Sequence, residues 1–198
     1  MKTQTYRSPK TTKSIALLLF GIGLILIGIA SLMLIPGLEK TTTGDISPAT
    51  AEAPSAIPAQ VDFPAPELRL SDVSGRSLSL TDFAGQVVLV NNWAIWCPPC
   101  KRELPDLEQF YQKHKDQNFI IVGIEAGSPE EGVKQFLNET ELTFPIWLDP
   151  DEKALDAFRT MDLPSSYVID GTGQVRLAWV GAVRYDILEK YVALMLAE

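Results

Sequence analysis

The chain has 198 residues, with 17 Lys/Arg against 25 Asp/Glu and an ordinary hydrophobic share of 46%. This length predicts one domain with additional segments rather than two full domains. Beyond residue 40 there are 12 Lys/Arg against 24 Asp/Glu, an acidic balance that argues against nucleic acid and anionic membrane surfaces as partners.

The N-terminal segment predicts a membrane anchor. Residues 15–35 are 21 residues without a charge, enough for a helix that crosses a hydrocarbon core of about 30 Å. Residues 1–14 contain basic residues and no acidic one: Lys2, Arg7, Lys10 and Lys13. The positive-inside rule therefore predicts a cytoplasmic N-terminus and an extracytoplasmic remainder at the cell membrane. A cleaved signal peptide is the alternative, but its apolar region would be shorter, about 7–15 residues.

A linker and one folded domain are expected after the anchor. Residues 36–60 are rich in Thr, Pro, Ala and Ser, a composition typical of a flexible linker without a core. Residues 61–198 contain no internal repeat and are long enough to bury a core. We therefore expect a single-pass protein with one extracytoplasmic domain.

Strands and helices alternate along the predicted domain. In chain order we expect strands at 68–70 and 77–80, a strand at 86–93, a helix at 97–115, a strand at 119–125, a helix at 129–140, a strand at 144–148, a helix at 152–159, strands at 166–170 and 174–180, and a helix at 184–196. Ser128 is the expected N-cap of the second helix, with Pro129 at its first position. The pattern predicts an α/β fold with a mixed sheet flanked by helices.

The chain has two cysteines, Cys97 and Cys100, which follow a predicted buried strand and open a predicted helix. A structural disulfide over so short a loop would add little stability. Structural zinc needs four ligands, but there is no second cysteine pair, and His114 lies nearly four helical turns away and is expected on the surface. The spacing therefore predicts a redox-active disulfide, with no metal.

The helix N-terminus favours the thiolate of Cys97, which would attack a partner disulfide before Cys100 resolves the mixed disulfide. Pro98 and Pro99 have no N–H to stabilise the thiolate. We therefore expect a moderately lowered pKa for Cys97, which favours a reductase over a strong oxidant. Glu103, one turn after Cys100, is expected to exchange protons with it; a solvated glutamate that complements the helix dipole is the alternative.

The segment from Val88 to Pro105, which contains Trp96-Cys97-Pro98-Pro99-Cys100, resembles the TlpA/ResA group of extracytoplasmic thioredoxin-like oxidoreductases, within the AhpC/TSA–redoxin superfamily. The likeness extends over roughly residues 62–182. It includes the stretches 63–66, 80–83, 144–146 and 163–170. The resemblance implies a thioredoxin-like fold with an N-terminal β-hairpin extension and a central inserted helix and strand.

The resemblance also implies roles for individual residues. Pro164 is similar to the cis-proline that faces the dithiol, and Leu163, Pro164 and Trp96 are implied to bind substrate. Glu103 is similar to the family's active-site glutamate. Asn91 stands where cytoplasmic thioredoxins keep a buried Asp, which shifts proton transfer to Glu103.

The function implied is a disulfide reductase that takes electrons from a membrane thiol carrier and acts on exported proteins. In this family a typical client is apocytochrome c, so a place in cytochrome c maturation is one expectation; a monomer without a cofactor is another. Two alternatives stay open. A thiol peroxidase would need a Pro-x-x-x-Thr-x-x-Cys setting, whereas residues 91–94 precede the dithiol here. A copper-binding assembly chaperone would need Cys-x-x-x-Cys and a distant His.

Overall fold

The computed structural model describes residues 55–196. The predicted basic N-terminus, the membrane span at 15–35 and most of the linker lie outside these residues. Within residues 55–196, no helix is long and apolar enough to span a membrane.

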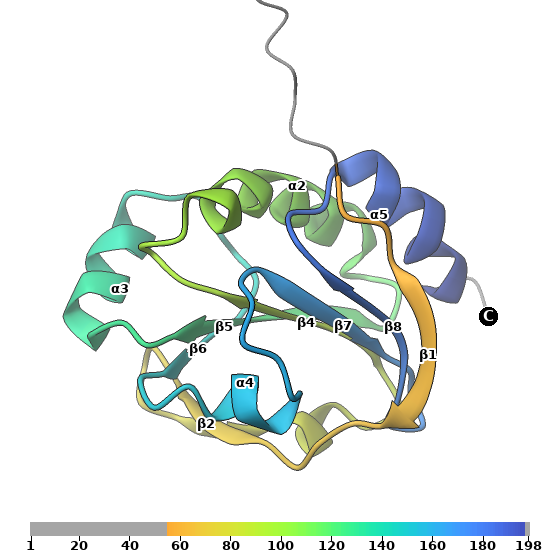
Figure 1. The fold of residues 1–198 in the computed structure, drawn as a ribbon, viewed down its shortest axis with the longest axis horizontal. Coiled ribbons are helices and arrows are strands. Elements are labelled where there is room, and N and C mark those ends of the chain that lie inside the picture. Colours follow the sequence, from red (N-terminus) through yellow and green to blue (C-terminus); the bar gives the residue numbers. More distant parts are fainter. Residues whose placement is uncertain (1–54, 197–198) are drawn as a thin grey trace, which may run out of the picture. The chain divides into compact units, whose positions relative to one another are not determined.

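A mixed β-sheet forms the centre of the described part of the chain (Figure 1). Its strands are β1 (Ala59–Pro64), β2 (Arg69–Asp72), β3 (Ser77–Ser79), β4 (Val87–Trp93), β5 (Phe119–Ala126), β6 (Ile146–Asp149), β7 (Ser165–Ile169) and β8 (Gln174–Val180). They lie in the order β1-β8-β7-β4-β5-β6-β2-β3. β4 pairs with β5, and β5 with β6, in parallel; the other pairs are antiparallel. The predicted mixed sheet and N-terminal hairpin are therefore confirmed.

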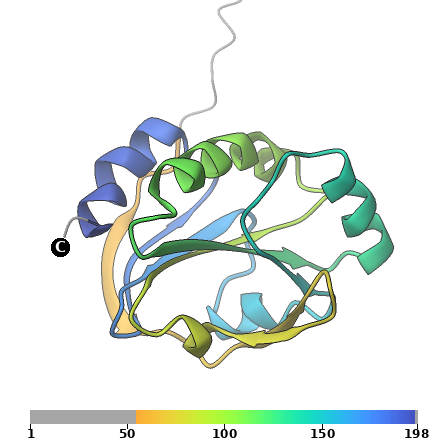
Figure 2. The same ribbon diagram turned by 180° about the vertical axis from the view of Figure 1, so that it is seen from behind.

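Helices cover both faces of the sheet (Figures 1 and 2). They are α2 (Pro98–His114), α3 (Glu130–Asn138), α4 (Lys153–Ala157) and α5 (Tyr185–Tyr191), with short 3-10 helices η1 (Leu80–Phe83) and η2 (Ala193–Leu196). α2, α3 and α5 pack on one face, where Leu89 and Trp93 of β4 belong to their core. Val88 and Val90 face the other way, toward α4 and η1, because successive side chains of a strand alternate between faces.

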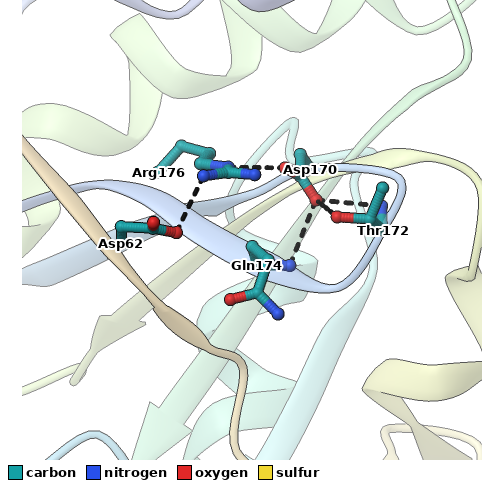
Figure 3. Close-up of polar contacts among 5 residues, drawn as sticks. All are labelled: Asp62, Asp170, Thr172, Gln174 and Arg176. Atoms are coloured by element: carbon teal, nitrogen blue, oxygen red, sulfur yellow. Dashed lines mark hydrogen bonds and ion pairs between the residues drawn. The ribbon is translucent and has the colours of Figure 1, made fainter.

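The first strand of the sheet was not predicted. β1 pairs antiparallel with β8 at the sheet edge and begins at Ala59, inside the stretch expected to be linker. Its sequence Ala-Gln-Val-Asp-Phe-Pro is too polar to predict a strand by itself. The backbone hydrogen bonds to the edge of β8 therefore stabilise this strand. Arg176 of β8 also ties β1 in place, because its Nη1 lies 2.7 Å from Oδ1 of Asp62 (Figure 3).

Several helix ends differ from the predictions. α3 begins at Glu130, and Ser128 does not cap it, because the Ser128 hydroxyl donates a hydrogen bond to Glu125 instead. The last helix, predicted as one unit over 184–196, is divided into α5 and η2. α2 begins at Pro98, with Cys97 as its N-cap.

The expectation of a surface position for His114 is wrong. His114 is 5% exposed, and its Nε2 lies 2.9 Å from Oε1 of Glu189 on α5. Burial raises the pKa of Glu189, but hydrogen bonds from Lys113 and His114 outweigh it and lower the pKa to about 2. The histidine therefore joins the end of α2 to α5, and the sequence of α2 alone does not show this partner.

Candidate redox site

Cys97 and Cys100 form a disulfide at the start of α2, with their Cα atoms 5.3 Å apart. Sγ of Cys97 accepts a hydrogen bond from the backbone N–H of Cys100 at 3.3 Å. Pro98 and Pro99 have no N–H to donate. Of the three residues that follow Cys97, only Cys100 can therefore donate a backbone hydrogen bond to its sulfur. Cys97 is 4% exposed and Cys100 is fully buried, which makes Cys97 the sulfur that a partner reaches first.

The loop that carries Cys97 leaves the end of β4. Trp93, the last residue of the strand, is fully buried, whereas Trp96 is 61% exposed beside the disulfide. The N–H of Cys97 donates to the carbonyl of Ala94 at 3.1 Å, which closes the turn between strand and helix. A large aromatic surface is thus held next to the more accessible sulfur.

The peptide bond between Leu163 and Pro164 is cis, as the resemblance implied. Pro164 directly precedes β7, whose first residue, Ser165, is paired with Asn92 near the end of β4. Leu163 packs against the hydrophobic cluster that includes both cysteines. The antiparallel pairing of β7 with β4 therefore brings the residues at 163–164 to the same end of the sheet as the disulfide.

Glu103 lies one turn after Cys100 and is 1% exposed. Its Oε1 accepts a hydrogen bond from Nδ2 of Asn91 at 2.8 Å, and its Oε2 accepts one from the N–H of Val183 at 3.0 Å. Burial raises its pKa to about 8, against the opposing effect of these two hydrogen bonds. The glutamate is therefore part of the protein interior behind the disulfide, and the alternative of a solvated glutamate is excluded.

Polar side chains occupy both faces of the sheet at the end of β4 near this carboxylate: Asn91 and Ser166 on the face of Glu103, and Asn92 and Ser165 on the opposite face, all buried. Asn91 Nδ2 also donates to Ser166 Oγ at 3.0 Å, and Asn92 Nδ2 to Ser165 Oγ at 3.2 Å. The Oδ1 atoms of both asparagines are buried and accept no hydrogen bond from any described residue. Two adjacent asparagines in an otherwise apolar strand were a visible sign of these polar contacts, but their serine partners come from β7, 73 or more residues later.

A second buried carboxylate, Glu125 on β5, was not predicted. It is fully buried, and its Oε1 accepts a hydrogen bond from the N–H of Ile95 at 3.1 Å. Burial raises its pKa. A lone acidic residue inside the apolar stretch Phe-Ile-Ile-Val-Gly-Ile-Glu-Ala was the sequence signal for it.

The site offers a pair of sulfurs rather than a metal-ligand set. Among residues 55–196, no group of three or more His, Cys, Asp or Glu side chains lies close enough to hold a metal ion. The arrangement combines a disulfide at a helix N-terminus, a buried carboxylate one turn below it, and an exposed aromatic side chain beside it. Such a site can exchange its disulfide with thiols of another molecule and move the protons that this exchange requires.

Comparison with known proteins gives a matching family and fold. Residues 61–178 match the AhpC/TSA family. The thiol–disulfide oxidoreductase ResA of Geobacillus thermodenitrificans is 34% identical over 128 residues, which cover 65% of this chain and 74% of that protein. ResA of Halalkalibacterium halodurans is 32% identical over 129 residues, which cover 65% of this chain and 73% of the relative.

Solved structures agree. A putative thiol:disulfide interchange protein DsbE from Chlorobium tepidum has a TM-score of 0.65 and 28% identity, and the match covers 70% of this chain and 98% of that one. The thioredoxin domain of a thiol-disulfide oxidoreductase from Bacteroides vulgatus has a TM-score of 0.62 and 28% identity, with coverage of 70% and 98%. The expected thioredoxin-like fold is confirmed by these likenesses.

Proposed function

We propose that this chain works as a disulfide reductase on exported proteins. It belongs to the AhpC/TSA family, in its TlpA/ResA-like group, and is a thiol–disulfide oxidoreductase. In this proposal Cys97 attacks the partner disulfide, Cys100 resolves the mixed disulfide, and Glu103 transfers protons. The domain would act outside the cytoplasmic membrane, held there by residues 15–35.

The observation that carries the proposal is the buried carboxyl of Glu103. Its pKa of about 8 lies close to the ordinary thiol pKa of about 8.5. A proton can then pass between Glu103 and Cys100 with little change in free energy, which is the condition for efficient acid–base catalysis near neutral pH. When Glu103 is ionised, its negative charge one turn from Cys100 also disfavours the Cys100 thiolate, and a disfavoured thiolate makes the disulfide harder to reduce, as in a reductase.

The reaction begins with the dithiol form. The Cys97 thiolate, stabilised by the Cys100 N–H, attacks one sulfur of the partner disulfide; that S–S bond breaks, a mixed disulfide forms, and the released partner thiolate takes up a proton. Glu103, in its carboxylate form, then accepts the proton of Cys100. The Cys100 thiolate attacks Sγ of Cys97, the second partner sulfur leaves as a thiolate that takes up a proton, and the Cys97–Cys100 disulfide remains. Two electrons have passed to the partner, and a thiol donor must return the protein to its dithiol form.

Asn91 is suited to both protonation states of Glu103. In the observed orientation its Nδ2 donates to Glu103, as a carboxylate requires. Its Oδ1, which accepts no hydrogen bond from a described residue, can accept the carboxylic O–H after the amide turns over. Asparagine can therefore serve the proton cycle at a position where a second buried carboxylate would add a like charge.

Substrate contacts are proposed for the side chains around the exposed sulfur. Trp96 offers a mainly exposed indole, and Leu163 and Pro164 lie at the same end of the sheet. Aromatic residues of this kind contribute much of the binding energy at protein interfaces. The proposed partners are proteins with an accessible disulfide, apocytochrome c among them, and a membrane thiol protein as electron donor.

The redox state of the protein in cells tests the direction of electron flow. Cells are quenched with acid, free thiols are alkylated with a reagent that adds mass, and the two forms are separated on a gel. We expect the dithiol form of Cys97 and Cys100 to predominate. A protein found mainly as the disulfide in growing cells would contradict the proposed reductase.

Protease treatment of spheroplasts tests the proposed location. We expect the domain at 61–198 to be digested in intact spheroplasts while a cytoplasmic marker survives. Protection of the domain until the membrane is lysed would contradict an extracytoplasmic position.

A further inference from the structure

Glu125 stands opposite Trp93 in the parallel pairing of β5 with β4. It is among the largest side chains that are fully buried in the domain. β5 lies two strands away from β7, whose Ser166 accepts a hydrogen bond from Asn91, the partner of Glu103. Glu103 accepts hydrogen bonds from Asn91 and Val183, and Glu125 accepts them from Ile95 and Ser128, so the two buried carboxylates share no hydrogen-bond donor.

Glu125 is hydrogen-bonded to the loop that precedes Cys97. Oε1 accepts hydrogen bonds from the N–H of Ile95 at 3.1 Å and from the hydroxyl of Ser128. Oε2 is buried and accepts no hydrogen bond from a described residue. A carboxylate with one unsatisfied oxygen is costly to bury, so it is not explained as a contribution to stability.

The distance to the disulfide is short. Ile95 precedes Cys97 by two residues, and two residues span at most about 7 Å of chain. With 3.1 Å from the Ile95 N–H to the carboxylate and about 3 Å for the cysteine side chain, the carboxylate lies within roughly 13 Å of the Cys97 sulfur. Glu125 belongs to no ion pair with a Lys, Arg or His of residues 55–196.

The charged groups on the elements around Glu125 are mainly acidic. Asp149 on β6 acts on it through its charge, and Glu152 lies in the loop next to Gly127. Glu130 and Glu131 are on the exposed first turn of α3, where Lys134 is paired with Glu130; Lys101 and Arg102 on α2 are exposed. Burial and the charge of Asp149 raise the pKa of Glu125, against the hydrogen bonds from Ser128 and Ile95.

We propose that Glu125 is a positioning residue of the redox site, which holds the Cys97 loop through the Ile95 N–H and whose negative charge opposes the Cys97 thiolate. The inference rests on the proposed role of Cys97 as the nucleophile. At an effective dielectric constant of about 20 and a separation of roughly 13 Å, one charge shifts the pKa of another group by about one unit. Glu125 would thus act on Cys97 as Glu103 acts on Cys100, so that each sulfur has its own carboxylate.

The test compares Glu125→Gln with Glu131→Gln in the full-length protein, solubilised in detergent. Glutamine keeps an acceptor for the Ile95 N–H and removes the charge, and Glu131 is an exposed carboxylate close by that controls for net charge. After reduction, the rate of iodoacetamide alkylation is measured against pH, and mass spectrometry identifies the modified cysteine. We expect the Cys97 pKa to fall by about one unit in E125Q and to stay unchanged in E131Q.

An unchanged Cys97 pKa in a folded E125Q protein would overturn the inference. A failure of the nucleophile assignment is distinguishable, because Cys100 would then be alkylated first in the wild-type protein as well. Circular dichroism and the melting temperature establish that the variant is folded.

A second measurement needs no variant. The carboxyl carbon of Glu125 is followed by NMR against pH in the reduced protein and in the protein with alkylated Cys97. Because coupling between two titrating groups is reciprocal, the pKa of Glu125 should be higher, by about one unit, when Cys97 can form a thiolate. Identical titration curves in the two forms would also overturn the inference.

Discussion

The pKa values of carboxyl groups are shifted in opposite directions at the two ends of the central sheet. At the dithiol end, Glu103 has a pKa raised to about 8 by burial, and Glu125 is also raised. At the other end, Asp170 sits in the β7–β8 turn (Figure 3). Burial raises its pKa, but hydrogen bonds from Thr172, Arg176 and backbone N–H groups outweigh this and hold the pKa well below the usual range.

The number of partners explains the difference. Asp170 accepts bonds from the N–H and hydroxyl of Thr172, the N–H of Gln174 and Nε of Arg176, and Arg176 carries a full positive charge. Glu103 accepts hydrogen bonds from one side-chain amide and one backbone N–H, and no ion pair joins it to a Lys, Arg or His of residues 55–196. The contacts of Asp170 stabilise its negative charge and the β7–β8 turn. The contacts of Glu103 leave its carboxyl group protonated up to a pH of about 8, so that it has a proton to transfer. We infer that stability is concentrated at the hairpin end and reactivity at the dithiol end.

Replacement of Cys97 should have the largest effect. In Cys97→Ser the nucleophile is lost, and reduction of a protein disulfide should fall by at least about a thousandfold. In Cys100→Ser the first step survives but resolution does not, so a mixed disulfide through Cys97 should accumulate and be visible on a non-reducing gel. Equal trapping by Cys97→Ser would contradict the assignment of the two roles.

The raised pKa of Glu103 predicts a dependence of stability on pH. A pKa of about 8 in the folded state, against an ordinary value of 4.5, means that the folded protein binds the proton more tightly. This contribution to stability is complete below pH 4.5 and decreases as the pH rises to about 8, by about 2–4 kcal/mol. Urea unfolding of the disulfide form at pH 5 and pH 8 measures it.

Glu103→Gln is the control for this dependence. The variant has no proton to lose, so its unfolding free energy should change much less between pH 5 and pH 8, and it should exceed that of the wild-type protein at pH 8. A wild-type protein as stable at pH 8 as at pH 5 would show that Glu103 is not held neutral by the fold. Asp170 acts in the opposite direction, because its lowered pKa adds stability that is lost only as the pH falls below about 4.

Asp170→Asn should destabilise the protein without a change in activity. The variant loses the ion pair with Arg176 and weakens the acceptor for Thr172 and Gln174, which should cost about 1–3 kcal/mol. Thermal unfolding measures the loss, and disulfide reduction at a temperature well below unfolding should remain at the wild-type rate. A large fall in activity of the folded variant would break the proposed separation between the two ends.

Trp96→Ala should have the smallest effect of these changes. The side chain is mainly exposed, so its removal should alter the unfolding free energy by less than about 0.5 kcal/mol. As a proposed substrate contact, its loss should raise KM for a protein substrate about 3- to 10-fold with little change in kcat. An unchanged KM would mean that the partner does not contact Trp96.

The sequence predicted the local features of the fold well. The predicted bounds of β4, α2, β5, β7 and β8 agree with the observed ones to within one residue at each end. The dithiol at Cys97 and Cys100 followed from spacing alone, and the cis bond at Pro164 followed from resemblance. These are features that neighbouring residues determine.

Features that depend on distant partners were missed. β1 forms by pairing with the edge of β8. His114 is buried against Glu189, 75 residues later on α5. Ser128 does not cap α3 because its hydroxyl donates a hydrogen bond to Glu125. Nδ2 of Asn92 on β4 donates a hydrogen bond to Oγ of Ser165 on β7, 73 residues later. A single sequence shows a polar residue in an apolar strand but does not show which side chain will meet it.

The reduction potential of the full-length protein tests the central claim most directly. The Cys97–Cys100 couple is equilibrated with glutathione or dithiothreitol buffers at pH 7, and the dithiol fraction is measured after alkylation. The account predicts a potential nearer the roughly −270 mV of thioredoxin than the roughly −120 mV of strong disulfide oxidants. A value at or above about −120 mV would contradict a reductase built on Glu103 and the two prolines.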